Sequence, residues 1–262
     1  MGALDVPRNL APPRLRFHFS RAGCRANVTG WCPRAPPSVS EVALSVAIAV
    51  FARPPVPGRV KTRLSPALPP EHAARLYGAM LSDTLAVAAA APLDLRAVFW
   101  TDPPGELDST PAHFESHIQV EKDLGERLSV AAHTLMARGH RVILVGSDCP
   151  GLTVALLTQA IEAVRLGDSV VGAAADGGYW LLGLSREAPE LFKDIDWSTG
   201  LVLQQTLARA ATAGLPIMML PLLTDLDTSK ELADLIGSLA AGEPNVCGPH
   251  LHAALRALSL IP

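Results

Sequence analysis

The stretch at 141–151, RVILVGSDCPG, combines a strand that can be buried on both faces with an acidic residue at its end. Residues 142–145 are four consecutive aliphatic residues, a pattern typical of a strand inside an α/β protein. Gly146 ends this strand, and the Pro-Gly pair beyond it prevents the strand from resuming. Asp148 therefore lies at the carboxyl end of a buried strand, where ligands bind in open α/β sheets. The alternative is that Asp148 only caps the helix that follows.

The rest of the chain alternates between predicted strands and predicted helices. Asp-Gly-Gly at 176–178, between two apolar runs, predicts an antiparallel hairpin across 170–184. The alternation otherwise favours a mostly parallel sheet flanked by helices. Strands are expected at 41–52, 95–101, 117–121, 141–147, 169–174 and 215–223, the last at an edge because of Pro216 and Pro221. Helices are expected at 70–91, 123–138, 153–166 and 229–239. A further helix is expected to begin after an N-cap at Ser198 or Thr199 and to end at about residue 213.

Residues 1–40 differ in composition from the rest of the chain. They hold six arginines and one acidic residue, are rich in proline and show no periodicity, so we expect a disordered extension. Hydrophobic residues make up 49% of the whole chain and charged residues 18%, which is enough for a sizeable core. We expect residues 41–240 to form a single domain and residues 241–262 to form a peripheral tail.

Charge and hydropathy argue against two classes of protein. After residue 40 the chain has 16 basic and 24 acidic residues, so this part is not an electrostatic nucleic-acid binder. The longest apolar run, 42–52, has 11 residues and is too short to span a bilayer. The four cysteines, at 24, 32, 149 and 247, show no CxxC spacing and support neither a zinc site nor a disulfide framework. We expect a soluble, cytoplasmic protein.

A basic loop follows the first predicted strand. Residues 53–64, RPPVPGRVKTRL, include three prolines, which fix φ, and a glycine, which allows a tight turn. Arg53, Arg59, Lys61 and Arg63 place four cations within eleven residues. Arginine supplies bidentate contacts to phosphate and lysine supplies a point charge. The loop is therefore expected to bind a polyphosphate, and the alternative is a solvated basic loop.

Two further groups of acidic residues follow predicted strands. Asp225 and Asp227 point the same way if the segment is extended, and the alternative is an N-cap plus a solvated acid. Asp176 either serves only its own turn or lies beside Gly177 and Gly178, which would let a ligand approach the backbone. Cations together with separated carboxylates are what a nucleoside di- or triphosphate with Mg²⁺ or Mn²⁺ requires.

These motifs resemble, in order, those of one known family. The resemblance covers roughly residues 44–236 and departs from the family at Arg53, where lysine is usual, so that charge is kept but geometry differs. The motifs are FARPPVPGRVKTRL (51–64), GSDCPGL (146–152), DGGYWLLGL (176–184), WST (197–199) and DLDT (225–228). The family that they resemble is the transferase 1 family associated with radical SAM/selenodomain proteins (DUF2064-like), often described as arsenosugar-biosynthesis-type glycosyltransferases.

The resemblance implies a GT-A-like fold, that of the nucleotide-diphospho-sugar transferases. It also implies that Lys61 and Arg63 bind the nucleotide phosphates, that Asp148 is the first metal ligand and that Asp227 is the second. Asp176 is then a candidate base or acceptor-orienting group. The residues expected to contact substrate are Arg53, Gly58, Thr62, Ser147, Gly177 and Gly178.

The sequence therefore predicts a metal-dependent transferase that uses a nucleotide-activated donor, as a glycosyltransferase acting on a small-molecule acceptor. The family is also similar to the guanylyltransferases that act on 2-phospho-L-lactate and on the molybdenum cofactor. A nucleotidyltransferase that releases pyrophosphate is thus the close alternative. A module that binds a nucleotide without catalysis is the third. The sequence leaves open the donor, the acceptor and the oligomeric state.

Overall fold

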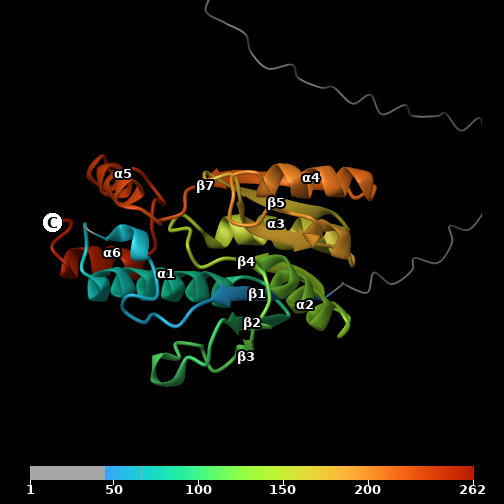
Figure 1. Cartoon of the computed structure of the whole chain (residues 1–262), viewed down its shortest axis with the longest axis horizontal. Helices are drawn as coiled ribbons and strands as arrows, with labels where there is room; N and C mark the ends of the chain where they lie inside the picture. Colours follow the sequence, from blue (N-terminus) through green and yellow to red (C-terminus); the bar gives the residue numbers. More distant parts are fainter. Residues whose placement is uncertain (1–44, 66) are drawn as a thin grey trace, which may run out of the picture. The chain divides into compact units, whose positions relative to one another are not determined.

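The computed structural model describes residues 45–65 and 67–262, and Figure 1 shows how its helices and strands are arranged. The predicted extension at 1–40 lies outside these residues. The strands are β1 (Val46–Ala52), β2 (Leu95–Trp100), β3 (Glu115–Ile118), β4 (Arg141–Val145), β5 (Ser169–Ala174), β6 (Tyr179–Leu184) and β7 (Ile217–Leu223). The helices are α1 (Pro70–Ala90), α2 (Leu124–Met136), α3 (Val154–Leu166), α4 (Val202–Thr212), α5 (Ser229–Ala240) and α6 (Pro249–Ala257). Among these helices, none has both the length and the apolar character needed to cross a bilayer.

The strands form one mostly parallel sheet in the order β3-β2-β1-β4-β6-β5-β7. β1 pairs in parallel with β2 and with β4, β2 pairs in parallel with β3, and β5 pairs in parallel with β7. β6 is antiparallel to both of its neighbours, β4 and β5. The predicted hairpin and the predicted edge position of β7 are confirmed.

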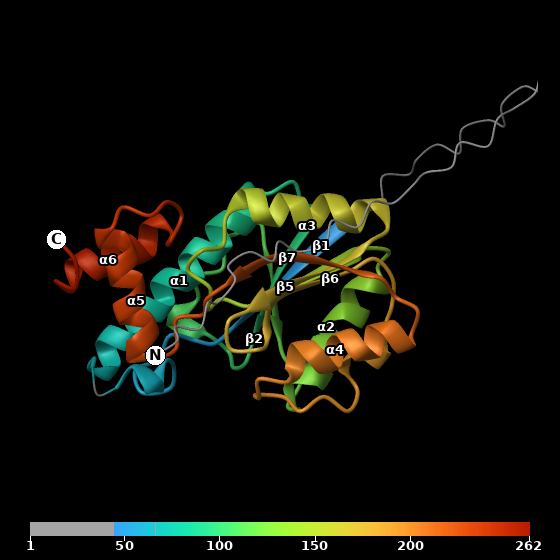
Figure 2. The same ribbon diagram turned by 90° about the horizontal axis from the view of Figure 1, so that it is seen from above.

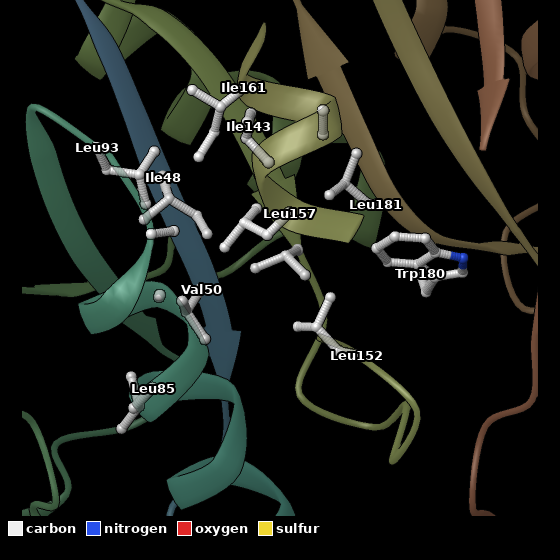
Figure 3. Close-up of a cluster of buried hydrophobic side chains, with 14 of the residues drawn as sticks. Ile48, Val50, Leu85, Leu93, Ile143, Leu152, Leu157, Ile161, Trp180 and Leu181 are labelled. Carbon is white, nitrogen blue, oxygen red and sulfur yellow. The ribbon is translucent and has the colours of Figure 1, made fainter. Parts of the chain in front are cut away.

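Helices cover both faces of the sheet. Figure 2 shows α1 and α3 on one side and α2 and α4 on the other. The period of two in β1 sends Ile48 and Val50 into the cluster under α1 and α3, and Ala47 and Ala49 into the cluster under α2. Figure 3 shows the first cluster, in which the strand residues pack against helix residues such as Leu157. Burial on both faces explains why β1 and β4 read as continuous apolar runs.

A third cluster lies where the C-terminal helices pack on α1. Asp83 of α1 is buried and accepts hydrogen bonds from the backbone N–H groups of His250 and Leu251, each at 2.9 Å. Leu251 and Leu255 of α6 are fully buried. Residues 249–257, expected in a peripheral tail, thus form a helix that is attached through a buried carboxylate and an apolar face.

Two local predictions are wrong. The strand predicted at 117–121 lies at Glu115–Ile118, because the pairing of β3 with β2 ends at Trp100. Neither Ser198 nor Thr199 caps α4, whose N-cap is Leu201. Ser198 adopts a left-handed conformation instead, with φ 64°. The Thr199 hydroxyl accepts from the Leu201 N–H at 3.2 Å within the turn that precedes the helix.

An ion pair joins the edge strand β3 to Arg138, directly after the C-cap of α2, and its contribution to stability should depend on pH. Arg138 donates two hydrogen bonds to Glu115, at 2.7 and 2.8 Å, and this lowers the pKa of Glu115 from 4.5 to about 2. The stabilisation is therefore present above pH 4.5 and is lost as the pH falls towards 2. Because the pair is exposed, Glu115→Gln should lower Tm at pH 7 by only about 1–3 °C. Circular dichroism melts should show this difference shrinking below pH 4.5. Glu162→Gln makes the same chemical change at an exposed position of α3 and should change Tm at pH 7 by less than Glu115→Gln does.

Candidate functional site

A cleft of about 500 Å³ opens at the carboxyl ends of β1 and β4. The loop after β1 and the loop after β4 form two of its walls, and the segment before α5 reaches it from the far end of the chain. Crevices at this edge are where α/β sheets bind ligands. Its lining includes eight of the residues singled out from the sequence: Arg53, Arg59, Lys61, Thr62, Arg63, Ser147, Asp148 and Asp227.

Lys61, Asp148 and Asp227 meet in this cleft. The Lys61 Nζ lies 2.5 Å from Oδ1 of Asp227 and 3.0 Å from Oδ1 of Asp148. The lysine side chain is 5% exposed, whereas those of Asp148 and Asp227 are 47% and 39% exposed. Burial alone would lower the pKa of Lys61, but the attraction of the two carboxylates outweighs it and raises the pKa to about 12. The ammonium group is therefore charged at any physiological pH.

Backbone contacts hold the two carboxylates together. The Leu226 N–H donates to the Asp148 carbonyl at 3.0 Å and so joins the loop after β4 to the segment after β7. The alternative predictions, that Asp148 or Asp227 caps the helix that follows it, are wrong. The N-cap of α3 is Thr153 and that of α5 is Thr228. Both carboxylates are thus available to a cation.

Tyr77 of α1 forms the floor of this part of the cleft. Its hydroxyl accepts from the Arg53 N–H at 2.8 Å and shares a 3.0 Å hydrogen bond with the Ser147 hydroxyl. Its ring lies under Lys61, with 5.9 Å between Nζ and the ring centroid. Tyr77 therefore fixes the start of the basic loop relative to the loop that carries Asp148.

Asp225 lies beside these groups but does not contact Lys61. Its carboxylate accepts from the Cys149 thiol, with 2.7 Å between Sγ and Oδ1. Burial, together with the negative charges of Asp176, Asp148 and Asp227, raises the pKa of Asp225 to about 6. Burial and the same carboxylate raise the pKa of Cys149, so the thiol stays protonated and serves as the donor. The site thus concentrates negative charge around a single buried ammonium group.

The remaining cations lie around the mouth of the cleft. Arg53 and Arg63 are exposed, and no carboxylate within the described ranges 45–65 and 67–262 forms an ion pair with either. Arg59 makes only a 3.7 Å contact with Asp102 at the surface. An adjoining cleft of about 470 Å³ shares Arg53, Arg59 and Arg127 with the first. Positively charged side chains therefore border both clefts.

The structure does not bring Asp176 and its glycines to the lining of this cleft. The Asp176 carboxylate accepts from the Gly178 N–H at 2.8 Å, within its own turn. A Cβ on Gly177 would lie 2.7 Å from the Cα of Gly200 and nearer still to its carbonyl oxygen. The missing side chain at 177 is thus accounted for by close packing of two backbone segments. Gly58 has φ 75°, as a tight turn requires, and is also outside the lining.

Sequence reasoning missed several polar residues of the cleft, among them Tyr77, Gln119 and Arg127. Tyr77 is one of only two tyrosines in the chain and lies on an otherwise apolar helix face, where a buried hydroxyl needs a partner. Gln119 is buried, and its side-chain amide donates to the Phe99 carbonyl at 2.6 Å, which leaves its oxygen free to accept from a ligand. No signal in the sequence distinguishes Arg127 from other helix arginines.

The donor set of this site fits a divalent cation. Two carboxylates converge on one cation, the Lys61 ammonium, so the position between them already favours positive charge. In the part of the chain that the structure describes, no cluster of three or more His, Cys, Asp or Glu side chains surrounds one point. Asp148 and Asp227 would therefore be the protein ligands, with phosphate and water oxygens completing the shell. Mg²⁺ characteristically binds in this way at nucleotide sites.

Comparison with known proteins defines the class of protein. Residues 80–199 match a family described as an uncharacterised protein conserved in bacteria, DUF2064. A crystal structure from Desulfovibrio desulfuricans G20, of a protein classed as a nucleotide-diphospho-sugar transferase, is 30% identical with a TM-score of 0.73. The match covers 82% of this chain and 95% of that one. No curated protein matches. This chain belongs to the nucleotide-diphospho-sugar transferase superfamily.

More distant structures share the fold. Rv0371c from Mycobacterium tuberculosis H37Rv is 20% identical with a TM-score of 0.50, over 75% of this chain and 99% of that one. The 4-diphosphocytidyl-2C-methyl-D-erythritol synthase from Anaerococcus prevotii DSM 20548 is 8% identical with a TM-score of 0.53, over 78% of this chain and all of that one. The predicted fold class, a GT-A-like mostly parallel sheet with an antiparallel hairpin, is therefore confirmed.

Proposed function

We propose that this protein is a metal-dependent transferase that takes a glycosyl group from a nucleotide-activated donor and gives it to a small-molecule acceptor. The observation that carries the proposal is the convergence of Lys61, Asp148 and Asp227 at the carboxyl edge of the sheet. These residues come from three distant segments, and a structural ion pair would need only two of them. The motif resemblance to the radical SAM-associated transferase 1 family supports the glycosyl choice.

Several charged residues in and around the cleft would act in this reaction. The acceptor oxygen attacks the anomeric carbon, the bond from that carbon to the nucleotide diphosphate breaks, and the diphosphate leaves with the electron pair. Mg²⁺ or Mn²⁺, held by Asp148 and Asp227, would supply positive charge to the leaving phosphates. Arg53 and Arg63 orient and neutralise the same phosphates from the mouth of the cleft. Asp176 is the proposed base or acceptor-orienting group and would take the proton of the acceptor hydroxyl; it lies outside the cleft lining, but its charge contributes to raising the pKa of Asp225.

A nucleotidyltransferase is the second candidate, and the number of cations favours it. Besides Lys61, the cleft is lined by Arg53, Arg59, Arg63 and Arg127. A triphosphate carries more charge than a diphosphate and would use more of these side chains. The reaction would then be attack on an α-phosphate with loss of pyrophosphate.

A ligand screen of the full chain tests the proposal. Thermal unfolding is measured with nucleotide sugars and with nucleoside triphosphates, each with and without Mn²⁺. A ligand at 100 times its Kd stabilises a protein by about 2.7 kcal/mol, which shifts Tm by several degrees. We expect a nucleotide sugar to raise Tm more with Mn²⁺ than without it.

Product analysis with the selected donor then separates the functions. Release of a nucleoside diphosphate, by slow transfer to water where the acceptor is missing, supports glycosyl transfer. Release of pyrophosphate from a triphosphate supports nucleotidyl transfer. Nucleotide binding that is insensitive to metal and produces no turnover indicates a binding module without catalysis. No response to any nucleotide would contradict all three.

A further inference from the structure

Lys61 has a position that its expected role in phosphate binding does not explain. Its Nζ is within 3.0 Å of two carboxylates, and its side chain is the most buried of the three. A lysine that only awaited phosphate would have its ammonium in solvent, as the exposed Arg53 and Arg63 have their guanidinium groups. The loop therefore turns one of its cations inward and leaves the others outside.

The backbone at Lys61 is shaped for this inward position. Lys61 has φ 48° and ψ 38°, a left-handed conformation that costs about 1 kcal/mol or more for a residue with a side chain. The short 3-10 turn at Thr62–Leu64 begins directly after Lys61. The Lys61 carbonyl accepts a hydrogen bond from the Leu64 N–H at 3.0 Å. The Tyr77 ring lies below the ammonium group. Several independent contacts thus hold the strained residue where its side chain enters the acidic group.

The charge balance indicates what this position is for. Asp148 and Asp227 together carry two negative charges, and one ammonium neutralises only half of them. A divalent cation would match the pair, and it would use the carboxylate oxygens that Lys61 now occupies, Oδ1 of each residue. The lysine and a metal ion therefore compete for the same oxygens.

We propose that Lys61 occupies the place of the divalent cation in the metal-free protein and leaves it when a metal ion binds. The inference rests on the proposed metal-dependent function and adds a regulation to that site. A metal ion alone would displace the ammonium group of Lys61 from its carboxylate partners and leave it unpaired in a poorly hydrated position. A metal ion that arrives with nucleotide phosphates provides a new anionic partner for it. Metal and nucleotide thus bind cooperatively, and the site binds metal more weakly when no nucleotide is present.

Binding of Mn²⁺ to the full chain without nucleotide tests the competition. The signal of free Mn²⁺ in electron paramagnetic resonance gives the dissociation constant for the wild type and for Lys61→Met. Because breaking a buried ion pair is costly, we expect Lys61→Met to bind Mn²⁺ at least about tenfold more tightly than the wild type. Arg63→Met is the matched control, since it removes one positive charge two residues away without removing an ion pair of the acidic group. It should change the affinity less than about threefold.

Two outcomes overturn the inference while leaving the proposed function in place. Equal Mn²⁺ affinity in the wild type and Lys61→Met would mean that the metal uses the outer oxygens and leaves the lysine where it is. An equal gain in Arg63→Met would mean that net charge alone controls affinity. If neither the wild type nor Lys61→Met binds Mn²⁺ and nucleotide binding is also insensitive to metal, the metal part of the proposed function fails as well.

A measurement on the wild type covers the case in which Lys61→Met does not fold. The chain has four lysines, at 61, 122, 193 and 230, so acetylation of each can be followed by peptide mass. Without metal, Lys61 should react far more slowly than Lys122 and Lys230, whose side chains are 62% and 82% exposed. Saturating Mn²⁺ should raise the rate at Lys61 several-fold and leave the other two unchanged. A rate at Lys61 that ignores saturating Mn²⁺ would overturn the inference.

Discussion

Asp148→Asn is expected to reduce turnover by at least about 100-fold while leaving the fold intact. Asparagine has the same shape but no charge, so one of the two negative groups facing Lys61 is lost. Removing a single electrostatic contact to the transition state typically costs a factor of 100–1,000 in rate. The substitution also removes one of the two proposed protein ligands of the metal. Metal-dependent binding of the donor should therefore weaken along with turnover.

The stability of this variant should be close to that of the wild type. The Asp148 side chain is 47% exposed, so an amide there remains hydrated. The hydrogen bond from Leu226 to the Asp148 carbonyl involves only the backbone and survives the substitution. Lys61 keeps its 2.5 Å partner, Asp227. Tm should therefore change by no more than about 2 °C, which separates a lost charge from a lost fold.

A second lysine–aspartate pair provides the control. Asp234 on α5 accepts from Lys230 at 2.7 Å, and both side chains are exposed outside the cleft. Asp234→Asn makes the same chemical change as Asp148→Asn without touching the site. Rates and donor affinities are measured for both variants with the donor found in the ligand screen. Full activity in Asp148→Asn would remove the metal role, and an equal loss in Asp234→Asn would show that the effect is not local.

The parts of the fold that follow from local pattern were predictable. β1 and β4 are buried on both faces, so they read as uninterrupted apolar runs and identify a parallel sheet. The prolines around β7 place it at the edge because a proline cannot donate to a neighbouring strand. A parallel sheet collects its loops at the carboxyl ends of the strands. For this reason the sequence could anticipate that Lys61 and Asp148 lie near each other.

The contacts within the site were not predictable, because they depend on tertiary geometry. The inward direction of Lys61 follows from a left-handed backbone that lysine rarely adopts, so no propensity indicates it. Thr153 caps α3, so the alternative in which Asp148 caps that helix is wrong. Before the register of the chain is known, an aspartate and a threonine are equally good caps. Helical spacing also does not reveal that the Tyr77 hydroxyl bonds with the Arg53 N–H and the Ser147 hydroxyl.

The glycine-rich motifs illustrate how packing can imitate a binding signature. Gly177 contacts the backbone of Gly200, directly after the WST motif. Gly125, at the start of α2, leaves room for the indole of Trp197, since a Cβ there would lie 2.5 Å from Nε1 of the ring. The Asp-Gly-Gly turn and the end of the WST motif therefore pack on one another, and Trp197 of the WST motif packs against the start of α2. Their spacing in the sequence carries no information about this, because the partners are 23 and 72 residues apart along the chain.

Gly177→Ala is expected to destabilise the protein by about 3 kcal/mol, or roughly 6–12 °C in Tm. Two costs add. Gly177 has φ 90°, where an L residue is strained by about 1 kcal/mol or more. The new methyl group would overlap the Gly200 backbone, which cannot move aside freely because the Leu203 N–H donates to the Gly177 carbonyl at 2.9 Å. The substitution therefore separates the turn after β5 from the start of α4.

Gly178→Ala is the control for Gly177→Ala. A Cβ on Gly178 would lie 3.1 Å from Oδ1 of Asp176, the end of a side chain that can rotate away. Gly178 also lacks the positive φ of Gly177. Gly178→Ala should therefore cost less than about 1 kcal/mol. The two variants add the same methyl group one residue apart, and they differ in the atoms that this methyl meets and in the sign of the backbone φ.

Thermal unfolding and donor binding of both variants then decide between the two roles of this motif. If packing explains Gly177, the alanine variant loses stability, and its remaining folded fraction at low temperature binds the donor with a Kd near that of the wild type. If Gly177 instead allows a ligand to approach the backbone, Tm stays within about 2 °C of the wild type and the Kd for the donor rises at least tenfold. A Cβ added to Gly177 would lie 2.7 Å from the Gly200 Cα. This favours the first result, because the Gly200 backbone already occupies the space that a ligand would need.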